Sequence, residues 1–223
     1  MRPIGSAALI VALALTGCTL PGADKDKPRP VISAPPLSKA DVWQDIASSE
    51  DANRIRRAGT AWSSGLAEAR GAGFESEIRA EGKLLSANAA QAKPAPTPGS
   101  YSCRMIRLGK EKPRGPAFQK FQPFFCYVGV EGELFTIVKQ TGSQRPAGRL
   151  WEDDNPSRLI FLGTLALGSE EEARAYGEDP RRDMAGILER IAPFKWRLII
   201  PFTQSGARID VFELTPVAEQ PPE

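Results

Sequence analysis

Residues 158–167 read RLIFLGTLAL, and this stretch decides the fold. An extended chain places alternate side chains on opposite faces, and here both faces are apolar. A strand that is apolar on both faces lies inside a sheet with a covering layer over it. The segment therefore predicts a central strand packed beneath a helix.

Five more short segments are rich in Ile, Val, Phe, Tyr and Trp and lie between Gly, Pro and Asp clusters, which is typical of antiparallel strands. They are residues 101–108, 124–130, 134–140, 196–202 and 207–214. In the fourth of them, apolar side chains alternate with Arg197 and Pro201, which predicts one core face and one wetter face.

Consecutive antiparallel strands without a long crossover close most simply as a meander, because a curled sheet has no exposed edges. We expect an α+β fold in which N-terminal helices precede an antiparallel β-meander curled into a small barrel or half-barrel with a disulfide. A flat sheet packed by helices is the second choice.

Helical patterns fill residues 38–86. Ser38 and Asp41 resemble a capping box at the start of a short helix, and two more helices are predicted over 50–70 and 75–86. Two further short helices are predicted inside the strand region, over 169–176 and 183–191.

The first residues have the three parts of an export signal: a charge at Arg2, an apolar run over 4–15, and the lipobox Leu15-Thr16-Gly17-Cys18. We expect cleavage after residue 17 and acyl chains such as palmitate on Cys18, which would anchor the protein stably to a membrane. The alternative is an ordinary cleaved signal in which Cys18 is incidental. Because Thr19 and not Asp follows, we favour the outer membrane and a periplasm-facing protein.

The organisation follows from composition. A signal peptide (1–17) precedes a disordered Pro-rich tether (18–37), a helical segment (38–86) and an Ala/Pro linker (87–99). An antiparallel β domain (100–216) and a disordered tail (217–223) complete the chain. Basic and acidic residues nearly balance, 29 against 27, and no basic block is interleaved with aromatic residues, so nucleic acid is not an expected partner.

Cys103 and Cys126 remain as an even pair in an oxidising compartment, and we predict a disulfide between them. The alternative is a reactive or metal-binding thiol pair. Such sites use short Cys spacings and His partners, and this chain contains no histidine.

The absence of histidine also excludes Ser-His-Asp triads, Cys-His dyads and His-ligated zinc. We expect no enzyme, no cofactor and no metal. Paired carboxylates remain possible in principle, but the acidic runs are typical of a strand-end turn and a helix's first turn. They are Glu152, Asp153 and Asp154, and Glu170, Glu171 and Glu172.

Residues 141–149 form a polar stretch with two glycines and two guanidinium groups. As a loop, it would bind an anion through Ser143, Gln144, Arg145 and Arg149. The alternative, which we favour, is a hairpin whose arginines pair with Glu152 or Asp153.

Several aromatic residues would line an apolar cavity if the sheet closes, although ordinary core filling is commoner. They are Phe124, Phe125, Trp151, Phe161 and Trp196.

The order of several motifs resembles the bacterial family catalogued as domain of unknown function 4893, over residues 43–216. The motifs are Pro98-Gly99-Ser100-Tyr101-Ser102-Cys103-Arg104, Cys126, the segment 142–149, Phe161-Leu162-Gly163-Thr164, Tyr176-Gly177 and Trp196-Arg197-Leu198. The resemblance implies no activity, cofactor or catalytic residue.

A looser likeness is to calycin barrels, including periplasmic protease inhibitors, because Gly99 and Tyr101 stand where those proteins have Gly and Trp. The N-terminal helices depart from that pattern. We expect a membrane-anchored envelope lipoprotein with a binding or structural role and an envelope protein as a partner. The alternatives are a carrier of a small apolar ligand and a protease inhibitor.

Overall fold

The computed structural model describes residues 38–168, 170 and 172–217. The expected signal peptide, Cys18, the tether up to residue 37 and all of the tail except residue 217 lie outside the described residues. The described residues belong to one compact unit, Leu37–Glu223. In this part of the chain, no helix is long and apolar enough to span a membrane.

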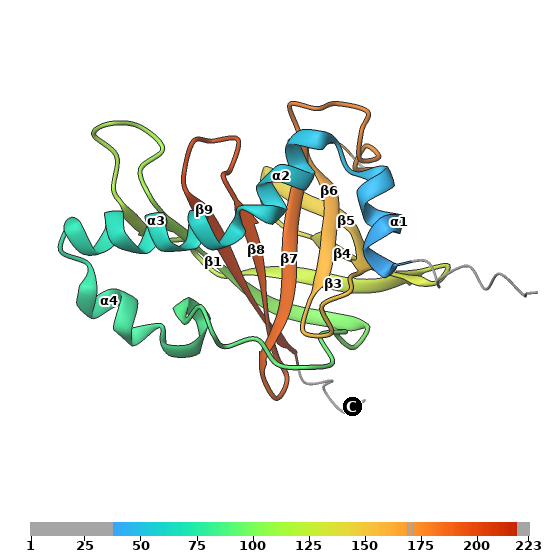
Figure 1. The fold of residues 1–223 in the computed structure, drawn as a ribbon, viewed down its shortest axis with the longest axis horizontal. Coiled ribbons are helices and arrows are strands. Elements are labelled where there is room, and N and C mark those ends of the chain that lie inside the picture. Colours follow the sequence, from blue (N-terminus) through green and yellow to red (C-terminus); the bar gives the residue numbers. More distant parts are fainter. Residues whose placement is uncertain (1–37, 169, 171, 218–223) are drawn as a thin grey trace, which may run out of the picture. The chain divides into compact units, whose positions relative to one another are not determined.

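The described residues contain nine strands that pair as an antiparallel meander (Figure 1). They are β1 (Gly99–Leu108), β2 (Phe118–Lys120), β3 (Phe124–Glu131), β4 (Leu134–Lys139), β5 (Gln144–Glu152), β6 (Leu159–Leu167), β7 (Asp183–Ala192), β8 (Lys195–Pro201) and β9 (Ile209–Pro216). The short β2 and the longer β3 pair with successive parts of β1. The other edge of β1 pairs with β9. Strands β1 and β3–β9 therefore close an eight-stranded barrel, which confirms the expected α+β fold.

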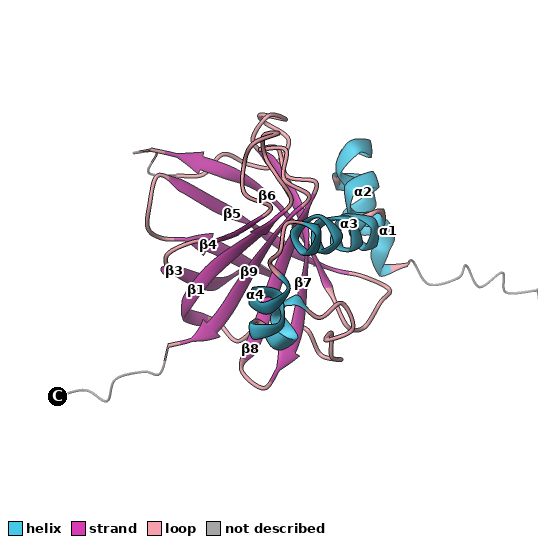
Figure 2. Ribbon diagram, turned by 90° about the vertical axis from the view of Figure 1, so that its left-hand side faces the viewer, coloured by secondary structure: helices cyan, strands magenta, loops and turns pink. Residues whose placement is uncertain are grey.

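The helices lie together on one side of the barrel (Figure 2). They are α1 (Lys39–Ile46), α2 (Ser49–Arg56), α3 (Ala58–Gly71), α4 (Glu75–Ala80) and the 3-10 turn η1 (Gly82–Leu85). Residue 65 of α3 is a glycine because its helix lies close to β9: a Cβ there would come within 3.0 Å of the Ile209 side chain.

Two apolar cores result from the alternation of side chains along the strands. One core fills the space between the helices and the outer face of the barrel, and it includes Trp62, Leu66, Ile160 and Leu162. The other core lies inside the barrel. Strand β6 contributes to both cores, as its two apolar faces predict.

Four helix predictions differ from the structure. The predicted helix over 50–70 is two helices that meet at Arg57, and the predicted helix over 75–86 is α4 followed by the 3-10 turn η1. The predicted helix over 183–191 is wrong, because these residues form β7. The predicted helix over 169–176 is also wrong in its described part, since residues 172–176 are not helical.

The predicted wetter face of β8 is also wrong. Arg197 is only 1% exposed, because its guanidinium group lies between the barrel and the helices. It pairs with Glu189 at 2.7 Å, stacks 4.6 Å from the Trp62 ring and donates to backbone carbonyls of η1 and the following turn. The buried guanidinium group joins the helical layer to the barrel. Its burial is tolerated because each of its nitrogen donors has an acceptor.

Candidate functional site

One end of the barrel is open and contains a cavity of about 780 Å³. Because the strands alternate in direction, the loops β1–β2, β4–β5, β6–β7 and β8–β9 all lie at this end, and residues from each of them line the cavity. We call it the open end.

The opposite end is closed by side chains and by the segment that precedes β1. The ring of Tyr101 packs edge-on against Trp196, with centroids 5.9 Å apart. The Tyr101 hydroxyl donates to the carbonyl of Thr97 at 2.7 Å, and the Trp196 indole donates to the carbonyl of Pro94 at 2.9 Å. Residues 94–97 of the predicted linker therefore cover this end of the barrel, which we call the closed end; we call these residues the stopper segment.

Apolar side chains from six strands form much of the inner wall of the cavity. They are Met105, Phe124, Leu165, Met184, Ile200 and Phe212. All of them occupy inward positions of their strands, in register with the residues that fill the closed end. The cavity is therefore the unfilled half of the barrel interior.

A paired charge lies in the same wall. The Arg107 guanidinium donates to both carboxylate oxygens of Asp210, at 2.7 and 2.6 Å, and to Glu111. Burial raises the pKa of the Asp210 carboxyl, although the ion pair opposes this effect. The negative charge of the Asp210 carboxylate is thus balanced by the bidentate Arg107 guanidinium group.

Lys139 is a second charged residue of the cavity wall, and unlike Asp210 it has no partner of opposite charge among the described residues. It is the last residue of β4, and its ammonium group is 4.3 Å from the centroid of the Phe124 ring. Burial lowers the pKa of Lys139. No carboxylate of the described residues lies within ion-pair distance of it. A Cβ on Gly142 would lie 3.5 Å from the Lys139 nitrogen, so the β4–β5 loop runs beside this charge.

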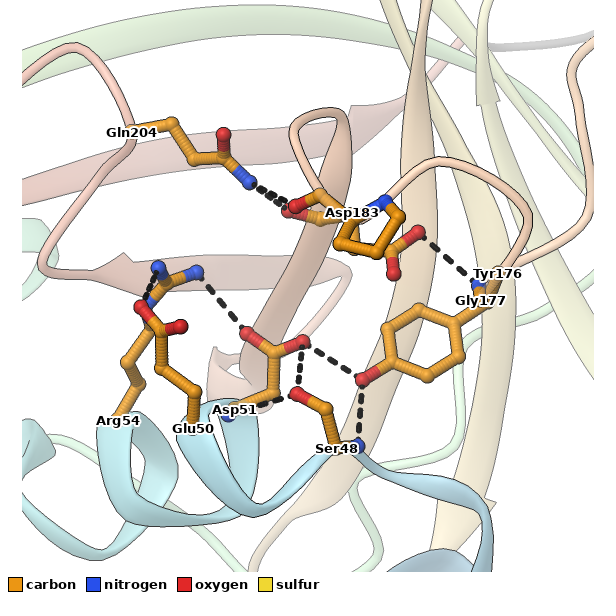
Figure 3. Close-up of polar contacts among 9 residues, drawn as sticks. Ser48, Glu50, Asp51, Arg54, Tyr176, Gly177, Asp183 and Gln204 are labelled. Carbon is orange, nitrogen blue, oxygen red and sulfur yellow. Dashed lines mark hydrogen bonds and ion pairs between the residues drawn. The ribbon is translucent and has the colours of Figure 1, made fainter.

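A polar cluster fixes the rim of the open end to the helices (Figure 3). The Tyr176 hydroxyl donates to Asp51 at 2.6 Å and accepts from the backbone N–H of Ser48 at 2.9 Å. Burial, helped by Asp51, raises the pKa of Tyr176 to about 12. From the next loop, the Gln204 amide donates to the carbonyl of Asp183 at 2.8 Å.

Residues 141–149, considered above as an anion-binding loop or, in the favoured interpretation, as a hairpin, are mostly strand β5, which pairs antiparallel with β4. Arg145 points outward and donates to the carbonyls of Gly168 and Glu170. Arg149 pairs with Glu131 at 2.7 Å, and not with Glu152 or Asp153.

The two remaining residues of that expected site also separate. Gln144 lines the cavity, whereas the carbonyl of Ser143 accepts from Gly168 N–H. The structure therefore does not bring the four residues together around one point.

Of the five aromatic residues considered for a cavity wall, only Phe124 lines the cavity. Phe161 and Trp196 belong to the inner core at the closed end. Trp151 packs against the core beneath the helices, and Phe125 is exposed on the outside of the barrel.

The acidic runs have structural contacts. Asp153 accepts from the Trp43 indole and pairs with Arg158, and Asp154 accepts from backbone N–H groups at the start of α1. Glu152 pairs with Lys39, and Glu170 pairs with Arg182. Glu171 is outside the described residues, and Glu172 has no ion pair within them.

Cys103 and Cys126 form the expected disulfide, with Cα atoms 6.0 Å apart. The bridge joins β1 to β3 inside the barrel, toward the closed end. Within the described part, no group of three or more acidic or cysteine side chains is arranged to hold a metal ion.

Sequence reasoning missed Lys139, Arg107 and Asp210 as cavity residues. A signal for Lys139 exists: in the pattern of β4, it shares the inward face with Phe135 and Ile137. A lysine in the inward register of a barrel strand indicates a charge directed toward the interior.

A comparison with models of known protein families agrees with the resemblance that the sequence motifs indicate. A family model described as "Domain of unknown function (DUF4893)" matches residues 43–214. No curated protein and no solved structure matches the chain.

Proposed function

Because the chain belongs to the DUF4893 family, whose description names no activity, we propose its function from its own cavity. The protein is a non-catalytic binding protein that takes a small apolar or amphipathic molecule into the open end of its barrel.

The observation that carries this proposal is a half-filled barrel. Sites for small molecules have volumes of roughly 300–1,000 Å³ and mainly apolar walls with a few polar groups. The cavity of about 780 Å³, with its apolar inner wall, meets both conditions. Eight-stranded barrels have room for one small ligand when side chains do not fill them.

The sequence supports a second part of the proposal, the location. The lipobox at Cys18 would tether the barrel to a membrane of the cell envelope, facing the periplasm and with the outer membrane as the favoured site. Metabolic labelling with an alkyne fatty acid tests this: the natural chain should incorporate label, and Cys18→Ala should not. Equal labelling of both chains would contradict lipidation at Cys18.

Native mass spectrometry tests the binding role. A soluble chain that starts at Thr19 and retains the whole compact unit is purified gently from its own periplasm. We expect extra mass of a few hundred daltons that denaturation releases. A bare mass, together with no binding of added amphiphiles, would contradict the proposal.

Two matched variants locate the bound molecule. Leu165→Trp places a large ring in the cavity, and we expect the extra mass to disappear. Val138→Trp places the same ring on the outer face of β4, where Val138 is exposed, and should leave binding unchanged.

A second candidate function is protein docking, which the outer face of β3 and β4 favours. Phe125, Tyr127 and Val138 are exposed there, and Tyr127 and Val138 are register partners. Site-specific crosslinking from Phe125 in cells tests this candidate. Loss of the crosslinked product in Tyr127→Ser, with retained stability, would support a partner at this face.

A further inference from the structure

We propose that the cavity selects amphiphiles with an anionic head, and that the ammonium group of Lys139 receives this head while the apolar chain extends into the barrel. This inference rests on the proposed binding function and names its ligand class.

The first argument is the pairing of the cations. Five cationic side chains line the cavity, and four of them have a carboxylate partner within the structure. Arg107 pairs with Asp210, Arg54 with Asp51, and Arg181 and Arg182 with Asp179. Among the described residues, Lys139 is the cation of this wall that lacks such a partner.

The second argument is the cost of that arrangement. The ammonium group lies against the face of Phe124, and burial lowers the pKa of Lys139 because the charged form loses solvent. A partly buried charge without a counter-charge is unfavourable, and an opposite charge nearby restores the charged form. An anionic ligand group beside Lys139 would supply that counter-charge.

The third argument is the relation of Lys139 to its neighbours. Gly142 has no side chain at the position beside the ammonium group, so the β4–β5 loop leaves space there. The apolar residues Met184 and Ile200 line the same cavity from β7 and β8. A molecule with a charged head and an apolar chain matches this division, whereas a wholly apolar molecule would leave Lys139 without a counter-charge.

The head could be a carboxylate, as in a fatty acid, or a phosphate, as in a single-chain phospholipid. Both are oxyanions that accept from an ammonium group. The test therefore includes both.

The test is calorimetric titration of the chain from Thr19 with dodecanoate, dodecyl phosphate and dodecanol, each below its micellar concentration. We expect the natural chain to bind the two anions at least tenfold more tightly than the alcohol. Lys139→Met should remove this preference by weakening anion binding, with dodecanol binding unchanged or tighter. The tighter of the two anions identifies the head.

Two control variants accompany it. Lys83→Met removes an exposed lysine of η1 that lies outside the cavity wall and should keep the preference for anions. Lys139→Arg keeps the positive charge and should retain most of the preference for anions. Unfolding midpoints of all variants show that the barrel remains folded.

The outcomes separate the two proposals. If the natural chain binds the acid and the alcohol equally, or if Lys139→Met keeps the preference for anions, the role of Lys139 is wrong while the binding function stands. If folded protein binds none of the three compounds, the binding function and this inference both fail.

Discussion

The closed end and the open end of the barrel are built from the same eight strands, yet their inward positions differ in size. At the closed end, Gly148 and Gly163 lie face to face, and a Cβ on either would come within 2.7 Å of the Phe161 ring. The missing side chains make room for that ring, which fills the barrel interior. Two residues beyond Gly163 along β6, Leu165 borders the cavity instead.

The difference teaches that one barrel can divide stability and binding between its ends. A filled interior gains dispersion and burial energy from close packing, whereas an open interior forgoes that energy and gains room for a ligand. The variants below should therefore change stability strongly at the closed end and weakly at the open end.

The largest effect is expected for Phe161→Ala. Phe161 is completely buried, and truncation of such a ring leaves a cavity that costs about 3–5 kcal/mol of unfolding free energy. Leu165→Ala at the open end should cost only about 1–2 kcal/mol, because its side chain already borders open space. Urea unfolding measures both. Equal losses would contradict the division between the two ends.

The next effect is expected for the double variant Cys103→Ala with Cys126→Ala. The cysteines are 23 residues apart, and opening a loop of this size lowers the unfolding free energy by about 3 kcal/mol in the chain-entropy account. Urea unfolding of the double variant should match that of the reduced natural chain. An unchanged midpoint would mean that the bridge does not stabilise the closed end.

A smaller effect is expected for Tyr101→Phe. The variant keeps the edge-on ring contact with Trp196 but removes the hydrogen bond to the carbonyl of Thr97. A neutral hydrogen bond contributes about 1 kcal/mol net, so the unfolding midpoint should fall slightly. Amide exchange should increase in the stopper segment near Thr97. Unchanged exchange there would show that the hydroxyl does not hold the stopper.

The last prediction concerns the rim of the open end, where Tyr176 has a pKa raised to about 12 by burial and by Asp51. A folded-state pKa above the ordinary value of 10.0 means that the stabilisation is complete below about pH 10 and is lost as the pH rises toward 12. Ultraviolet titration of the three tyrosines should show a late phase that Tyr176→Phe removes. A late phase that persists would assign it to another tyrosine, such as the buried Tyr101.

The sequence predicts the strands whose apolar pattern is local, and β6 is the clearest case. It does not predict β5 or β7. Pro146 and Gly148 have the composition of a turn, but Gly148 is required because β5 approaches Gly163 of β6 closely. In β7, Met184, Ile187 and Leu188 have the i, i+3, i+4 spacing of a helix face, and pairing with β6 and β8 overrides this local pattern.

The candidate site was harder to predict for the same reason. The two arginines singled out from the segment 141–149 lie on the outside of β5, because the side-chain alternation of a strand assigns them there. Lys139 is distinguished by its surroundings. The Phe124 ring of β3 and Gly142 of the β4–β5 loop lie beside its ammonium group, and no carboxylate of the described residues is within ion-pair distance. Closure of the barrel creates these surroundings, and no local pattern encodes closure.

The pairing of β1 with β9 has a consequence for the biogenesis of the protein. The eight residue pairs of this seam join the first and last strands of the barrel, so β1 has no partner on that edge until the ribosome has made residue 216. Contacts so distant along the chain form slowly, because a long loop must be ordered first. The barrel therefore closes only after β9 has been made, so its folding is completed late in synthesis and not strand by strand.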